Sequence, residues 1–111
     1  MKKFLVIYRM DMDAMKKMMA ESSEADRKKG MEEWGTWMKE NAAGFADIGG
    51  PIGKNSEVSA GGAVEKSNDV AGYSVVGAES KEAAIAFIQG SPHFKMPGAT
   101  ADHAEVVNMG M

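Results

Sequence analysis

The residues best suited to chemistry lie in a short turn, Ser91-Pro92-His93-Phe94, that follows a predicted helix. Gly90 and Pro92 end that helix, because proline cannot continue it, and the turn can then aim His93 into a cleft. An imidazole titrates near neutral pH, so His93 is predicted to act as a general base or as a hydrogen-bond anchor for a ligand. The alternative is a loop histidine that caps the helix or meets solvent.

Asp47 is the predicted partner of His93 in catalysis. It lies on a predicted strand, Phe45–Gly49, just before a Gly-Gly-Pro bend. Its alternation with Phe45 predicts a partly buried carboxylate. Near a histidine, such a carboxylate would have a shifted pKa and could act as a base or an anchor. A hydrogen bond from Asp47 to the glycine turn is an equally open interpretation.

His103 and Glu105 form a second candidate pair on the predicted final strand. They stand two residues apart, so they share one face of that strand. If this face looks into a cleft between two subunits, the pair suits acid/base chemistry or weak metal binding. If it looks outward from an edge strand, the two residues are solvated and discourage aggregation. Both alternatives stay open from the sequence.

A ligand pocket is expected between the first helix, the Gly49-Gly50-Pro51 bend and the Ser91–Phe94 turn. Apolar and aromatic side chains would form its walls, with His93 and Asp47 as its polar anchors. The predicted ligand-binding residues are Tyr8, Trp34, Trp37, Ser91, Phe94 and Met96. Trp34 and Trp37 have an alternative role, because tryptophans at this spacing also pack a helix onto a sheet.

Methionine is unusually frequent, with 11 residues, and five of them fall between Met10 and Met19. Met15, Met18 and Met19 have helical spacing, which predicts a short amphipathic helix. Thioethers bind copper(I), so a soft-metal site is one alternative. Flexible apolar packing is the other, and no histidine or cysteine lies nearby to complete a metal site. We therefore expect no cofactor and no metal.

Composition narrows the class of protein. The 111 residues carry a net charge of −3 and include no cysteine, which excludes disulfides, thiolate zinc sites and a cysteine nucleophile. Basic residues form only short pairs, which argues against nucleic acid or an anionic membrane as partner. No apolar run is long enough to span a membrane, and no signal-peptide pattern is present. We expect a single soluble, cytoplasmic domain covering residues 1–111.

Hydrophobic periodicity and turn signals predict two helices and four main strands. The helices are expected over about Glu24–Ala43, with a capping box at Ser23 and Asp26, and from Ser80 to Gly90. The strands are expected at Lys3–Met10, at Phe45–Gly49, from Val70, and at Asp102–Asn108. After the Gly-Gly-Pro bend, the second strand is expected to resume pairing at Glu57–Ala60. A hairpin loop is expected at Ala63–Asp69.

This order, β-α-β-β-α-β, predicts a ferredoxin-like α+β fold. Right-handed crossovers place both helices on one face of a four-stranded antiparallel sheet. The other face would expose large apolar side chains of the first and third strands, which a soluble monomer rarely does. A second copy packed on that face would cover them, so we expect a homodimer.

Several motifs together resemble the YCII-related family of the dimeric α+β barrel superfamily. They are the first strand Phe4–Met10, Trp34-x-x-Trp37-Met38, Asp47–Pro51, Gly72-Tyr73-Ser74 and Ser91–Phe94. The resemblance covers nearly the whole chain and implies a ferredoxin-like protomer that dimerises through the sheet face, with a cleft beside the helices. It also implies a histidine early in the first helix and an aspartate in an Asp-Pro-aromatic turn. This chain has no such histidine, and Ser91 replaces the aspartate.

Three functions follow as hypotheses. The first is a small-molecule-binding homodimer with the pocket described above. The second is a cofactor-free enzyme of the lyase, isomerase or monooxygenase type, with His93 as general base and Asp47 as its partner. Because the family's histidine and aspartate are missing at the matching positions, we favour binding over catalysis. The third is an interaction module that binds no ligand.

Overall fold

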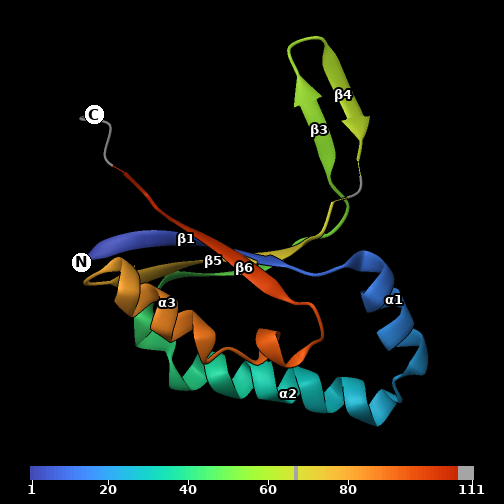
Figure 1. Ribbon diagram of the computed structural model, residues 1–111, viewed down its shortest axis with the longest axis horizontal. Coiled ribbons are helices and arrows are strands. Elements are labelled where there is room, and N and C mark those ends of the chain that lie inside the picture. Colours follow the sequence, from blue (N-terminus) through green and yellow to red (C-terminus); the bar gives the residue numbers. More distant parts are fainter. Residues whose placement is uncertain (67, 108–111) are drawn as a thin grey trace.

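The computed structural model describes residues 1–66 and 68–107 (Figure 1). Its strands are β1 (Lys2–Arg9), β2 (Phe45–Pro51), β3 (Ser56–Ser59), β4 (Gly62–Glu65), β5 (Val70–Ala78) and β6 (Thr100–Glu105). Its helices are α1 (Met12–Glu21), α2 (Glu24–Glu40) and α3 (Lys81–Gln89). Two short 3₁₀ turns, η1 (Ala42–Gly44) and η2 (Pro92–Lys95), follow α2 and α3.

Four strands form an antiparallel sheet in the order β2-β5-β1-β6. This is the strand order of the ferredoxin-like fold, with the first and third main strands in the middle. The prediction of an α+β fold with a four-stranded antiparallel sheet is therefore confirmed. None of the helices in the described residues is long and apolar enough to cross a membrane.

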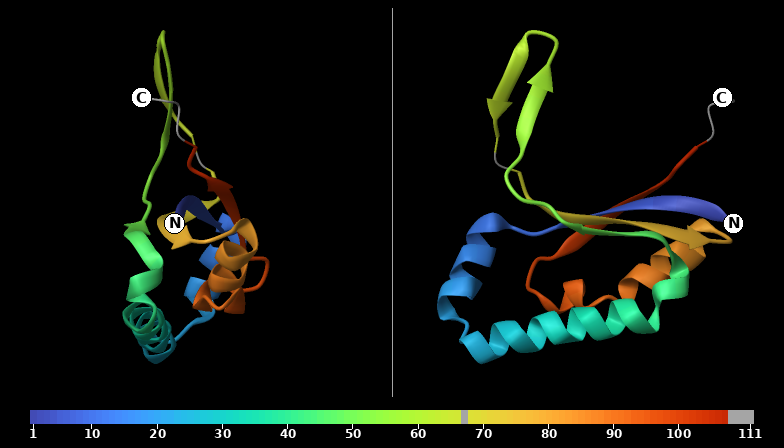
Figure 2. Two further views of the ribbon diagram at one scale, coloured as in Figure 1. Left: turned by 90° about the vertical axis from the view of Figure 1, so that its left-hand side faces the viewer. Right: turned by 180° about the vertical axis from the view of Figure 1, so that it is seen from behind.

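The helices all lie on one side of this sheet (Figures 1 and 2). The strand side chains that point toward them are buried, among them Phe4, Val6 and Val76. α3 contributes Ala84 and Ile88 to the same core. One hydrophobic core thus fills the space between the sheet and the helix layer.

The opposite face of the sheet has no helix over it (Figure 2). The residues that alternate with the core positions on β1 and β5 point to this side. They are half-buried or exposed, with Leu5 at 36% and Tyr73 at 37% exposure. We call this the open face, and its apolar members on β1, β5 and β6 are Leu5, Ile7, Tyr73, Val75 and Ala104.

Side-chain caps explain where the helices begin. Ser23 and Asp26 form the expected capping box at the start of α2, each bonding to the other's backbone N–H. Ser80 accepts a hydrogen bond from the backbone N–H of Ala83 at the start of α3. Asp11 caps α1 in the same way. These local signals were all readable from the sequence.

Several predicted boundaries need correction. The stretch Ala63–Asp69 was expected to be a hairpin loop, but its first three residues belong to β4 and pair with β3. The hairpin turn is formed instead by Ala60 and Gly61. The Gly61-Gly62 pair permits the tight reversal of the chain here. The last strand begins at Thr100 and ends at Glu105; Asn108, its predicted end, lies outside the described residues.

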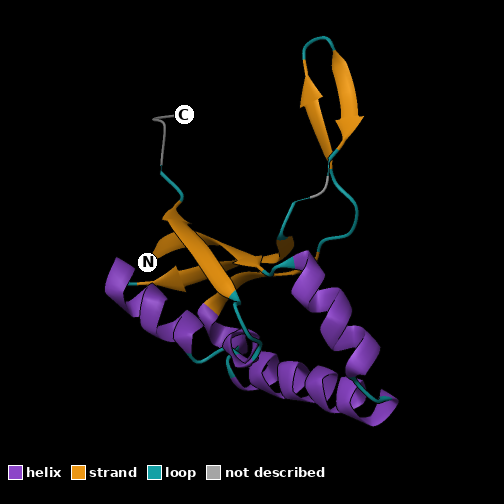
Figure 3. Cartoon of the chain, turned by 45° about the vertical axis from the view of Figure 1, so that its right-hand side comes forward, coloured by secondary structure: helices purple, strands orange, loops and turns teal. Residues whose placement is uncertain are grey.

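The β3–β4 hairpin stands apart from the four-stranded sheet (Figure 3). It rises on the side of the open face, away from the helices (Figure 1). All eight of its strand residues are exposed. We call Ser56–Glu65 the arm.

Gly49 gives a direct test of how β2 joins the sheet. Its φ is +70°, and a Cβ at this position would collide with the backbone carbonyl oxygen of Tyr73. Gly49→Ala is expected to lower the free energy of unfolding by about 2 kcal/mol or more. Gly50→Ala is the matched control, since a Cβ there meets no atom within 4 Å. Chemical denaturation of both variants checks this, and equal losses would contradict it.

Candidate functional site

His93 is buried, with 2% of its surface exposed, and bonds to two neighbouring strands. Its Nε2 lies 3.1 Å from the carbonyl oxygen of Arg9 and 2.8 Å from that of Thr100. A carbonyl oxygen only accepts, so Nε2 must carry the proton and donate to both. His93 therefore ties η2 to the end of β1 and the start of β6.

Aromatic rings surround His93. Its ring centroid lies 5.1 Å from that of Tyr8, 5.4 Å from that of Phe94 and 6.4 Å from that of Trp34. Trp34 also meets Tyr8 edge to face at 5.6 Å. The predicted set Tyr8, Trp34, His93 and Phe94 is thus brought together, but as packed rings and not as the walls of an open pocket.

Trp37 belongs to a neighbouring group of rings. It packs against Phe45 of β2 at 5.5 Å and against Phe87 of α3 at 5.4 Å. Trp34 meets it edge to face at 5.8 Å, so the two tryptophans link both ring groups along α2. The alternative in which the tryptophans pack the helix onto the sheet is what the structure shows.

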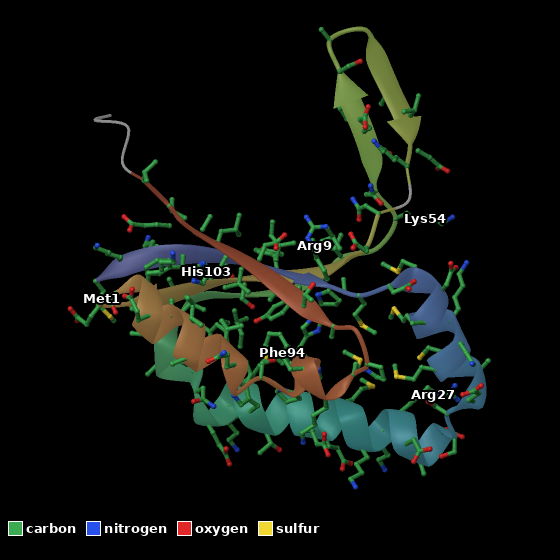
Figure 4. The ribbon with its side chains drawn as sticks, viewed as in Figure 1. Met1, Arg9, Arg27, Lys54, Phe94 and His103 are labelled. Carbon is green, nitrogen blue, oxygen red and sulfur yellow. The ribbon has the colours of Figure 1, made fainter. Side chains whose placement is uncertain are left out.

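Ser91 and Met96 flank the histidine turn. Ser91 is buried, and its hydroxyl oxygen accepts a hydrogen bond from the backbone N–H of His93 at 3.1 Å. This bond caps η2, with Pro92 at the first position of the turn. Met96 follows η2 and is half-buried. Phe94 remains 39% exposed beside the turn (Figure 4). The turn is thus held rigidly by its own side chains.

Tyr8 forms the polar part of this cluster. Its hydroxyl donates to Ser74 Oγ at 3.1 Å, and Ser74 Oγ donates to the carbonyl oxygen of Ile48 at 2.9 Å. Burial raises the pKa of Tyr8 above its ordinary value, while the hydrogen bond between Tyr8 and Ser74 partly offsets that rise. Tyr8 therefore stays protonated at neutral pH and acts as a donor that links β1, β5 and β2.

Asp47 does not join this cluster. The strand register shifts after Phe45, which turns Asp47 to the open face, where it is exposed. The expectation of a partly buried carboxylate is therefore wrong. Its Oδ1 accepts a hydrogen bond from the backbone N–H of Gly49 at 2.9 Å, which is the structural alternative.

Asp47 also lies far from His93. It is on the edge strand β2, while His93 bonds to β1 and β6, at least two strands away. With strands about 4.8 Å apart, the two side chains are roughly 10 Å or more apart across the sheet alone. The structure does not bring them together as a pair, so a catalytic role for either residue stays a prediction.

His103 and Glu105 lie on the helix side of β6, opposite Val6 and Phe4 of β1. His103 is half-buried against the ring of Phe4, 5.7 Å away, and its Nε2 has no hydrogen-bond partner. Glu105 is exposed and lies 3.8 Å from Lys2. His103 therefore lies neither on the open face nor fully in solvent. β6 is an edge strand, and its register places His103 on the core side, so the side chain is half-buried there.

A groove opens next to the aromatic cluster, beneath α1. It has a volume of about 440 Å³ and runs between α1, the start of α2 and the chain after η2. Its lining residues are Met10, Ala14, Lys17, Met18, Glu21, Ser22, Asp26 and Pro97. We call it the α1 groove. Gly49, Gly50 and Pro51 do not line it, so the predicted Gly-Gly-Pro wall is not part of it.

The methionines give the α1 groove its character. Sulfur atoms gather on the inner side of α1 (Figure 4), and Met10 and Met18 line the groove. Met10 is 5% exposed, whereas Met19 points outward and is 44% exposed. Thioether side chains adapt to the shape of an apolar ligand. In the described residues no group of three or more acidic or histidine side chains is placed to hold a metal ion.

A second, more polar groove of about 490 Å³ lies at the other end of α1. Arg9 borders it and forms ion pairs with Asp69 at 2.7 Å and with Asp102. Figure 4 shows Arg9 on the side of the sheet away from the helices. These carboxylates raise the pKa of the Arg9 guanidinium, so its charge is already matched within the protein. Among the described residues that line this groove, no cation is therefore left free for a ligand.

The chain matches no protein-family model and no curated protein sequence. Among solved structures it resembles the 5-chloro-2-hydroxyhydroquinone dehydrochlorinase of Burkholderia phenoliruptrix AC1100, solved in complex with 2,5-dihydroxybenzoquinone. The TM-score is 0.54 and the sequence identity 12%, over 90% of this chain and 90% of the dehydrochlorinase chain. At that identity the likeness shows the fold alone.

Sheet order, helix layer and this likeness agree on one class of structure. The chain has a ferredoxin-like α+β fold, the fold that the order of its predicted elements indicated.

Sequence reasoning missed the α1 groove as the place where a pocket forms. The helical spacing of Met15, Met18 and Met19 was the available signal, and it was interpreted as packing or metal binding. Met10 lies just before α1 in the chain, but Pro97 comes from a distant part of it. Only the tertiary structure brings Pro97 beneath α1.

The role of His93 as a tie between strands is testable. His93→Ala removes the donor for the carbonyl oxygens of Arg9 and Thr100 and leaves a cavity among aromatic rings. We expect it to lower the free energy of unfolding by about 2–4 kcal/mol. His103→Ala is the matched control, because Nε2 of that half-buried histidine makes no hydrogen bond; its loss should be about 1 kcal/mol or less. Equal losses in thermal or chemical unfolding would show that the strand tie contributes nothing.

Proposed function

We propose that this protein is a homodimer that binds a small, largely apolar molecule in the α1 groove. The observation that carries the binding role is the groove itself, whose volume falls in the range of small-molecule sites. Its walls combine adaptable methionine side chains with a few charged groups at the rim, including Lys17 and Asp26.

The open face supports the dimer. Leu5, Tyr73 and their neighbours form a continuous apolar surface on the central strands, without any covering element in the described part of the chain. Burying apolar area is favourable by about 25 cal/mol per Å², so a second copy seated here would be stabilised substantially. The resemblance of the motifs to the YCII-related family, whose protomers pair through this face, points the same way.

The dehydrochlorinase adds one hint about the ligand. That protein, with the same fold, was solved with 2,5-dihydroxybenzoquinone bound. A flat ring of this size would fit within the volume of the α1 groove. We therefore favour an aromatic or quinone-like ligand.

A charge on the open face tests the dimer. Leu5→Asp is expected to convert the protein from the mass of two chains to that of one, because the new carboxylate would be desolvated at the interface. Met31→Asp, on the exposed surface of α2, is the control and should leave the mass unchanged. Light scattering coupled to size-exclusion chromatography measures both. A wild-type protein that runs as a single chain would contradict the dimer.

A charge in the α1 groove tests the binding role. Two probes suit the site: 8-anilinonaphthalene-1-sulfonate, followed by fluorescence, and 2,5-dihydroxybenzoquinone, followed by calorimetry. Met18→Lys should weaken binding of either probe at least about tenfold, whereas Met19→Lys, on the outer side of α1, should not. A dimer that binds neither probe, or whose binding ignores Met18→Lys, would contradict the proposed site and favour a pure interaction module.

A further inference from the structure

The arm, Ser56–Glu65, is an element whose own protomer gives it little support. β3 and β4 pair with one another, and every strand residue in the arm is exposed. Two of these residues are large and apolar, Val58 at 76% and Val64 at 62% exposure. A lone two-stranded hairpin is at best marginally stable in water. Its apolar side chains therefore need a surface to pack on.

The overall dimensions point to the same need. The radius of gyration is 15.7 Å, compared with about 13 Å for a compact chain of this length. The molecule extends 49 by 44 by only 19 Å. Figure 1 shows that the arm accounts for much of this spread, because it stands well clear of the sheet and the helices.

We propose that the arm of each protomer clasps the second copy of this chain, packing Val58 against the flank of the partner. This inference rests on the homodimer proposed above. The arm rises on the side of the open face, where that partner would sit (Figures 1 and 2). An arm placed on the helix side of the sheet would not meet a partner seated there.

The arm is long enough for this contact. From Pro51, at the end of β2, to Ala60 at the hairpin turn, the extended chain covers roughly 30 Å. Two stacked sheets lie only about 10 Å apart. The arm therefore passes the level of the partner's sheet and reaches along its side.

The position of the arm gives a further reason. The arm is an exposed element on the same side of the sheet as the open face, so a partner seated there would bury additional area against it.

Each face of the arm carries one valine. Val58 pairs with Ala63 across the hairpin, and the Ser56–Glu65 pair lies on the same face at the base of the arm. The opposite face pairs Val64 with Glu57, whose carboxylate forms an ion pair with Lys66. The Val58–Ala63 pair is the one nearer to the hairpin turn and contains no charged residue, so this end of the arm suits an apolar contact with the partner.

Val58→Asp tests the clasp. It is expected to raise the dimer dissociation constant at least about 100-fold, because two-fold symmetry removes two buried valine side chains at once. Met31→Asp is the matched control, because Met31 has the same 76% exposure but lies on α2. Analytical ultracentrifugation of both variants and of the wild type gives the constants.

Hydrogen exchange gives a second measurement that does not depend on the Val58→Asp variant. The backbone amides of the arm should exchange at least about tenfold more slowly in the wild-type dimer than in the Leu5→Asp monomer. A wild-type dimer whose dissociation constant ignores Val58→Asp and whose arm exchanges at the same rate in both states would overturn the clasp and leave the homodimer standing. A monomeric wild type would overturn both proposals.

Discussion

The rest of the structure depends on one constraint: the helices cover only one face of the sheet. Core residues such as Phe4 and Val76 are fully buried on that side, while Leu5 and Tyr73, one position along the same strands, remain open. A strand sends alternate side chains to opposite faces, so an apolar strand such as β1 cannot satisfy both faces with a single helix layer. The proposed second copy would cover the exposed apolar side chains, and the proposed clasp by the arm would add to that contact.

The histidine turn shows how a residue suited to chemistry can be used for architecture. His93 donates from Nε2 to the carbonyl oxygens of Arg9 and Thr100 and so joins the ends of two strands. Rings of Tyr8, Trp34 and Phe94 exclude water around it.

The proposed ligand site lies at α1 and the proposed clasp at the arm. These two elements make the least contact with the core. α1 has no buried residue, and its attachment includes one hydrogen bond from Arg27 to the carbonyl oxygen of Met19. A loosely held amphipathic helix over a methionine-lined groove can adjust to a ligand at little cost. The arm likewise has no buried strand residue in its own protomer, and the partner would supply the missing contacts.

The sequence by itself determined the fold class and the capped starts of the helices. Strand alternation in β1, the capping box at Ser23 and the Gly90-Ser91-Pro92 stop are short-range features, so they can be recognised without the rest of the chain. The sheet order followed from element order and crossover handedness.

Only the tertiary structure decided which of the chemically promising residues meet. A register shift in β2 moved Asp47 to the open face, and a one-residue change of this kind reverses the direction of a side chain. The partners of His93 are backbone carbonyls, which any residue could provide, so residue types gave no sign of them. The α1 groove brings Pro97 near Met10 and Met18 from a distant part of the chain, and such contacts depend on packing, which local patterns do not encode.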